Sequence, residues 1–110
     1  MIDETVTKLE AQLREAGNLS PERKAELLEL ISTLKSEVSE LSKTNEEEAQ
    51  SIARFAEVST LEATRSAKNQ RLQELSLEGL KSSVEGFEKS HPRLVQVVNS
   101  ISQTLSNLGI

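Results

Sequence analysis

Apolar residues recur along this chain at alternating spacings of three and four positions. That spacing places them on one face of an α-helix, and the segments between them carry no strand signal. The pattern therefore predicts an all-α protein, either an antiparallel helical bundle or a long helical hairpin with coiled-coil-like seams. We expect a single domain over residues 1–110, because 12.1 kDa gives room for one core.

The first two helices are bounded by recognisable start and stop signals. The first is predicted over about residues 3–16, ending in a left-handed turn at Gly17. The second is predicted over 21–43, because Ser20 is a typical N-cap residue and a proline follows it. A polar stretch then interrupts the leucine row without a firm stop, so continuation of this helix to residue 67 stays open.

Between residues 45 and 70, alanine occupies the row that leucine fills in the flanking segments. Alanines spaced by seven let two helices approach closely but bury little area per residue. Val58 and Leu61 fall off this row, so we expect them to be partly exposed or to contact a second partner. The row itself consists of Ala49, Ala56 and Ala63.

Two more helices are predicted after the alanine row. The first covers 70–90 or 77–90, and it ends there because a residue before proline avoids the α conformation. Gly79 and Gly86 would lie inside it, which indicates either close packing on that face or a weak, mobile helix. The last helix is predicted over 92–108. Together with the alanine row, its apolar positions form the predicted seam for packing or oligomer formation: Leu94, Val98, Ile101, Leu105 and Leu108.

The last helix is unusual because no charged residue follows Arg93. An outer bundle helix normally carries charges, whereas uncharged polar side chains tolerate burial when they are hydrogen-bonded. We therefore expect this helix to be covered on several sides. Because one chain alone would leave apolar rows in water, we also expect a homo-oligomer, with a dimer favoured.

Composition narrows the classes of partner. The chain has 18 acidic and 13 basic residues and a net charge of −5, which argues against nucleic-acid binding. It has no cysteine, so it has no disulfide and no thiolate site. No segment approaches the roughly 18 consecutive apolar residues of a membrane span, and the first residues do not resemble a signal peptide. Cytoplasmic localisation is therefore the default expectation, and membrane association is not expected.

The chemistry of any site would depend on the single histidine, His91. Glu88 and His91 have the i, i+3 spacing of carboxylate-bridged metal bundles, which makes them candidate metal ligands across a two-fold axis. The simpler interpretation is that His91 caps the helix that Pro92 opens. Because the chain lacks a nucleophile motif and a second base to orient His91, we expect no catalytic residue, no cofactor and no enzymatic activity.

Both ends of the chain resemble a known family. The residues concerned are Phe87-Glu88-x-Ser90-His91-Pro92-x-Leu94 and the ending Leu105-x-x-Leu108-Gly109-Ile110, with a leucine-striped opening around Leu19-Ser20-Pro21-Glu22. These resemble the domain-of-unknown-function 4404 family of short bacterial helical proteins. The resemblance covers about 1–42 and 76–110, and 45–70 looks like an insertion. It implies a helical fold and brings no known activity, substrate or cofactor.

The sequence therefore favours a non-catalytic helical scaffold or protein-interaction module that is homo-oligomeric and has an unidentified protein partner. Two alternatives from other classes stay open. One is a metal-binding bundle of carboxylates and histidines built across a dimer axis. The other is a peripheral membrane protein that uses residues 94–110.

Overall fold

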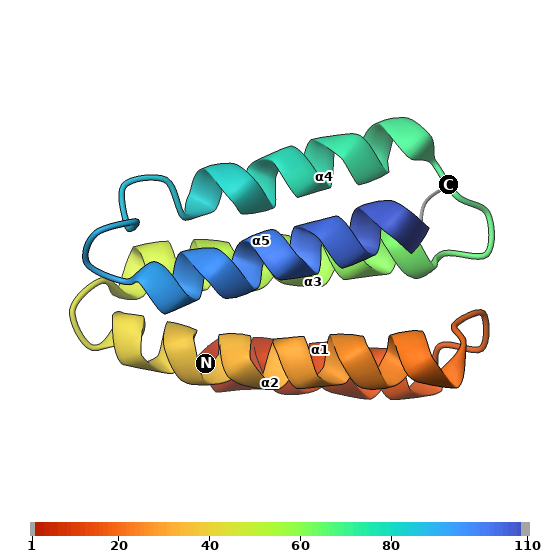
Figure 1. Cartoon of the computed structure of the whole chain (residues 1–110), viewed down its shortest axis with the longest axis horizontal. Helices are drawn as coiled ribbons and strands as arrows, with labels where there is room; N and C mark the ends of the chain where they lie inside the picture. The colour runs from red at the N-terminus through yellow and green to blue at the C-terminus, as the bar shows by residue number, and fades with distance from the viewer. Residues whose placement is uncertain (1, 109–110) are drawn as a thin grey trace.

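The computed structural model describes residues 2–108 and shows five α-helices packed side by side in one bundle (Figure 1). No β-strand occurs within that range, so the predicted all-α class is confirmed. The molecule measures 37 × 24 × 21 Å, and the bundle alternative therefore holds over the long hairpin. The helices are α1 (Ile2–Glu15), α2 (Pro21–Ser42), α3 (Glu46–Thr64), α4 (Gln70–Ser83) and α5 (Pro92–Leu108).

Local capping explains where the helices begin. The Ser20 hydroxyl accepts a hydrogen bond from the backbone N–H of Arg23 at 3.2 Å, which confirms Ser20 as the N-cap of α2. Asn69 caps α4 in the same way, accepting from Leu72 N at 3.0 Å. The stretch 21–67 contains two helices, because the chain leaves the helical path at Asn45, whose φ is −138°.

Two expectations about glycine were wrong. The first helix does end near the predicted residue, but Gly17 is not left-handed; Gly86, with φ of 94°, is the residue with positive φ between residues 2 and 108. The fourth helix stops at Ser83 and does not reach residue 90. Its end coincides with a tight turn in which the Glu88 carboxylate accepts hydrogen bonds from Gly86 N at 2.9 and 3.1 Å.

Helix α3 is the centre of the bundle, because it contacts each of the other four helices. Crowding on most of its sides explains why its buried residues are mainly small. At Gly79 of α4, a Cβ atom would overlap the Phe55 ring of α3, so the predicted close packing at that glycine is confirmed. The buried residues of α3 are Ala49, Ile52, Ala53, Ala56, Ser59, Thr60 and Ala63.

The leucine-rich rows are buried inside this one chain. All seam residues of α5 are fully buried except Leu108, which is partly buried, and the three seam alanines of α3 are buried as well. The expectation that a single chain would leave these rows in water was therefore wrong. Five helices supply enough neighbours to cover them, so any second copy has to bind elsewhere.

Candidate interaction surfaces

Large apolar side chains gather on the outer surface of α3 and α4. Between 39 % and 43 % of each is exposed, whereas the core side chains have 5 % exposure or less. Together with Glu62 and Ser76, four of them line a groove of about 210 Å³ between the two helices. We call this surface the apolar face, and it consists of Phe55, Val58, Leu61, Leu72 and Leu75.

The two helices of the apolar face are held together by contacts that the alanine row alone would not supply. The Ser59 hydroxyl donates to the carbonyl oxygen of Ser76 at 2.9 Å, and both residues are buried. The Phe55 ring packs over Gly79 about one helical turn away. These contacts fix the spacing of the two helices from within. The groove between them is lined by four side chains of the apolar face, whereas Leu61 lines the pocket beside α1.

Sequence reasoning found two of the five residues of the apolar face. The exposure of Val58 and Leu61 is confirmed. Phe55 was missed, although a signal was present: Phe55, Val58 and Leu61 follow each other at steps of three, which forms a second apolar row beside the alanine row. A helix with two apolar rows has either a second neighbour or an exposed apolar stripe.

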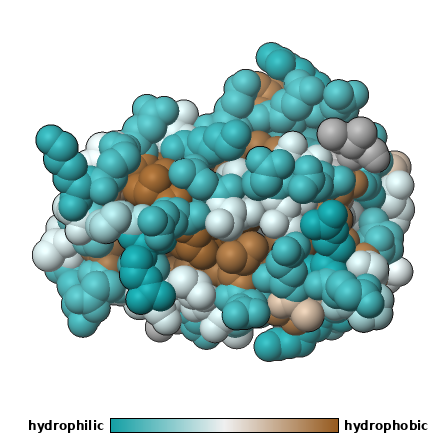
Figure 2. All heavy atoms as spheres, viewed as in Figure 1, coloured by the Kyte–Doolittle hydropathy of each residue, from teal (hydrophilic) through white to brown (hydrophobic). Residues whose placement is uncertain are grey.

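The outer side of α5 forms a second and different surface. The expectation that α5 is covered on several sides holds only for its inner half, where Ser102 and Thr104 are buried. A groove of about 460 Å³ separates α5 from α2, and Figure 2 shows apolar atoms in the hollow between these helices. Within residues 94–108 the exposed side chains are uncharged and polar: Gln96, Asn99, Ser100, Gln103 and Asn107.

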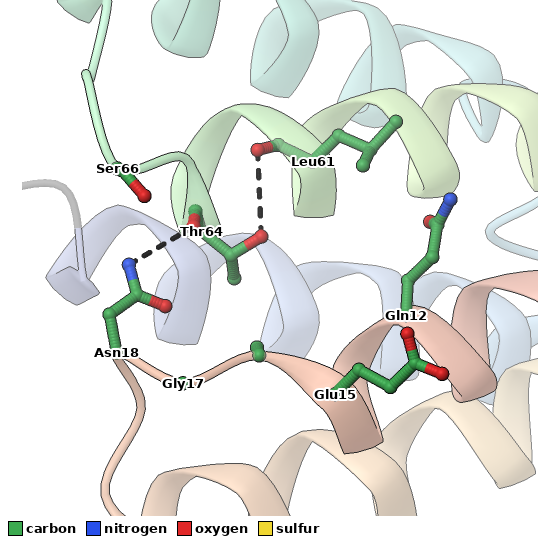
Figure 3. A pocket seen from close by; sticks show the side chains of 8 residues that line it. Gln12, Glu15, Gly17, Asn18, Leu61, Thr64 and Ser66 are labelled. Atoms are coloured by element: carbon green, nitrogen blue, oxygen red, sulfur yellow. Dashed lines mark hydrogen bonds between the residues drawn. The ribbon is translucent and has the colours of Figure 1, made fainter.

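A small polar pocket of about 370 Å³ lies where the ends of α1 and α3 meet (Figure 3). Gln12 and Glu15 extend from α1 toward this site, and Asn18 Nδ2 donates to the carbonyl oxygen of Thr64 at 3.0 Å. The Gln12 Oε1 atom is buried without a hydrogen-bond partner in the described part of the chain. Glu15 is the one ionisable side chain in the lining, so the pocket offers no acid–base pair.

The two candidate metal ligands have structural partners of their own. The Glu88 carboxylate closes the turn at Gly86. The His91 ring lies edge-on against Phe87 at 5.7 Å, and its Nδ1 is 2.9 Å from the Ser90 hydroxyl oxygen. The backbone carbonyl of His91 accepts from Val95 N at the start of α5, which fits the capping interpretation. Among residues 2–108, no cluster of three or more His, Asp or Glu side chains is placed to hold a metal ion.

The apolar row of α5 packs into the bundle, so these residues are not available to a membrane surface. A lipid surface would meet the uncharged polar side of α5 in place of its leucines. Membrane-surface helices usually place Lys or Arg on their polar side, and α5 has none after Arg93. In the described part of the chain, no helix is both long and apolar enough to cross a bilayer.

Fold and surfaces together define an all-α, five-helix bundle whose distinctive features are exposed helix–helix grooves. A family model agrees with this class: the domain of unknown function DUF4404 matches residues 27–110, and the chain belongs to that family. The match includes the motif around Phe87 and Pro92; the status of 45–70 as an insertion stays a prediction. Comparison with curated proteins and with solved structures found no match.

Proposed function

We propose that this protein is a non-catalytic helical interaction module that forms a homo-oligomer through its apolar face. The observation that carries the proposal is the group of five large apolar side chains left 39–43 % exposed on α3 and α4. Contiguous exposed patches of this kind mark association sites in soluble proteins. A second copy of the same face would cover them in a two-fold contact, the commonest arrangement among homo-oligomers.

The size of the apolar face is in the range that a dimer needs. Complete burial of one such side chain contributes about 1.5–3 kcal/mol, and roughly two-fifths of each remains exposed. The ten side chains of a two-fold dimer would therefore contribute about 6–12 kcal/mol. Loss of translational and rotational freedom costs on the order of 4–15 kcal/mol. These terms are comparable, so we expect the contact through the apolar face to dissociate on dilution.

The non-catalytic part of the proposal is supported by the surface chemistry. The polar pocket presents Glu15 as its one ionisable side chain. The single histidine is engaged at the start of α5 by Phe87 and Ser90. Groups held in this way stabilise a turn and are not aimed at a shared reaction centre.

Light scattering coupled to size exclusion tests the proposal. We expect the wild-type mass to be a multiple of 12.1 kDa and Leu75→Glu to lower it, because a carboxylate cannot be buried in an apolar contact. Ala25→Glu is the matched control, since Ala25 is exposed on α2, away from the apolar face. Circular dichroism would show that both variants are folded. A wild-type monomer, or a folded Leu75→Glu protein of unchanged mass, would refute the proposal.

A further inference from the structure

The outer side of α5 carries a row of carboxamide side chains. Gln96, Asn99, Gln103 and Asn107 follow each other at steps of three, four and four, and all four are exposed. We call this row the amide stripe. One hydrogen bond joins two of its members, from Gln103 Nε2 to Asn107 Oδ1 at 3.3 Å. Between residues 2 and 108, no side-chain hydrogen bond is made by Gln96 or Asn99, which leaves their donors and acceptors available to a partner.

The amide stripe borders a hollow with an apolar component. The groove between α2 and α5 is lined by Leu30 together with Asn99, Ser100 and Gln103. Figure 2 shows apolar atoms there, surrounded by hydrophilic ones. An apolar centre within a polar, hydrogen-bonding rim is the usual anatomy of a protein–protein contact.

The lack of charge on the amide stripe favours a second copy of the chain as its partner. A two-fold contact places a surface against itself, so the surface must be complementary to itself. Two copies of a chain with a net charge of −5 repel each other. The amide stripe itself adds no charge to such a contact, because no charged residue lies between residues 94 and 110. Glu26 of α2 lines the same groove, and its carboxylate lies 3.4 Å from the guanidinium of Arg23. Each carboxamide also has both donors and an acceptor, so it can hydrogen-bond to an identical group.

We propose that the amide stripe binds the amide stripe of a second copy, with the two α5 helices antiparallel. This contact is separate from the apolar face, because the groove beside the amide stripe is lined by residues of α2 and α5, whereas the groove of the apolar face is lined by residues of α3 and α4. In this arrangement Gln96 of one copy faces Asn107 of the other, since both residues are equally far from the middle of the stripe. Two independent two-fold contacts on one chain assemble four copies when their axes cross at right angles, and a longer polymer when they do not.

The inference goes beyond the apolar face, and it shares with the proposed function only the expectation that the chain self-associates. A set of three variants separates the two contacts: Gln103→Lys, Leu75→Glu and the combination of both. Gln103→Lys places two like charges in the amide contact. We expect each single variant to have the mass of a dimer, twice 12.1 kDa, and the combined variant to have the monomer mass of 12.1 kDa. Ser36→Lys is the control, because Ser36 is exposed on α2.

Each outcome of this set bears on one contact. A folded Gln103→Lys protein with the wild-type mass would overturn the amide contact and leave the apolar face untouched. A Gln103→Lys monomer together with an unchanged Leu75→Glu protein would support the amide contact and refute the apolar face. Binding of Gln103→Lys to anionic vesicles, with its mass unchanged, would show that the stripe faces lipid and would also overturn the inference.

Disulfide trapping tests the antiparallel geometry, because the chain has no cysteine of its own. A mixture of Gln96→Cys and Asn107→Cys proteins should form mixed disulfide dimers at least several-fold faster than either variant forms them alone. Faster self-crosslinking of Gln96→Cys would indicate parallel helices and contradict the proposed arrangement. A Ser36→Cys protein gives the rate of random encounter.

Discussion

Helices α3 and α5 have opposite patterns of buried and exposed side chains. Both have one side in the core and one side in water. Helix α5 buries its large apolar residues and exposes carboxamides, whereas α3 buries mainly alanines and exposes Phe55, Val58 and Leu61. The difference follows from position: α3 contacts all four other helices, and α5 contacts three. A helix at the centre of a small bundle has room mainly for small side chains, and most of its large ones lie outside.

The same difference separates the two proposed contacts. The apolar face gains its free energy from area removed from water. The amide stripe gains less from area, and its advantage is that it adds no charge to a contact between identical copies and offers matched hydrogen bonds. Variants in the core and on the surface of both helices therefore test whether the position of a helix in the bundle explains which of its residues are buried.

The largest expected effect is a charge in the buried row of α5. Ile101 is completely buried, so Ile101→Glu leaves a carboxylate without a partner and should cost more than about 4 kcal/mol in the free energy of unfolding. Urea unfolding measures this directly. Gln103→Glu, two residues further along α5, is exposed within the chain and serves as the control, and its monomer should change by less than about 0.5 kcal/mol. Equal losses in both variants would mean that α5 has no outer side.

A smaller loss is expected from a large residue in the crowded side of α3. Ala56 is completely buried, and Ala56→Leu has to displace neighbouring helices, which should cost about 1–3 kcal/mol. Ser51→Leu puts the same side chain on the exposed side of α3 and should change stability by less than about 0.5 kcal/mol. If Ala56→Leu were as stable as the wild type in urea, the central position of α3 would not explain its small residues.

The smallest effect is a gain in stability. The Ser102 hydroxyl is buried in α5 and has no hydrogen-bond partner within the described residues. Removing an unpaired buried polar group is favourable, so Ser102→Ala should raise the free energy of unfolding by about 1 kcal/mol. Thermal melting would report it as a higher midpoint. A lower midpoint would show that the hydroxyl has a hydrogen-bond partner inside the folded protein, and the prediction would then be wrong.

Sequence reasoning succeeded where a single residue dominates the local backbone. Pro92 places the start of α5, and Ser20 with Pro21 places the start of α2. It did not locate the end of α4, because Gly86 tolerates both a helix and a left-handed turn. The side chain that accompanies the turn, Glu88, acts through a contact that periodicity does not contain.

The candidate surfaces were only partly predictable. Apolar periodicity shows that a row is buried, but it does not show whether the same chain or a second chain buries it. For that reason the sequence predicts for the α5 row a seam for packing or oligomer formation, and in the structure the other helices of the chain cover it. The lack of charge after Arg93 was recognised correctly as unusual, but only the structure divides it into an inner half that is buried and an outer stripe that is exposed.

The most direct test is the mass of the unmodified protein in solution, measured by light scattering over a wide range of concentrations. Self-association through the exposed faces predicts a mass well above 12.1 kDa at high concentration that falls toward 12.1 kDa on dilution. A constant mass of 12.1 kDa throughout the range would contradict it, and both the apolar face and the amide stripe would then be ordinary solvent-exposed surface.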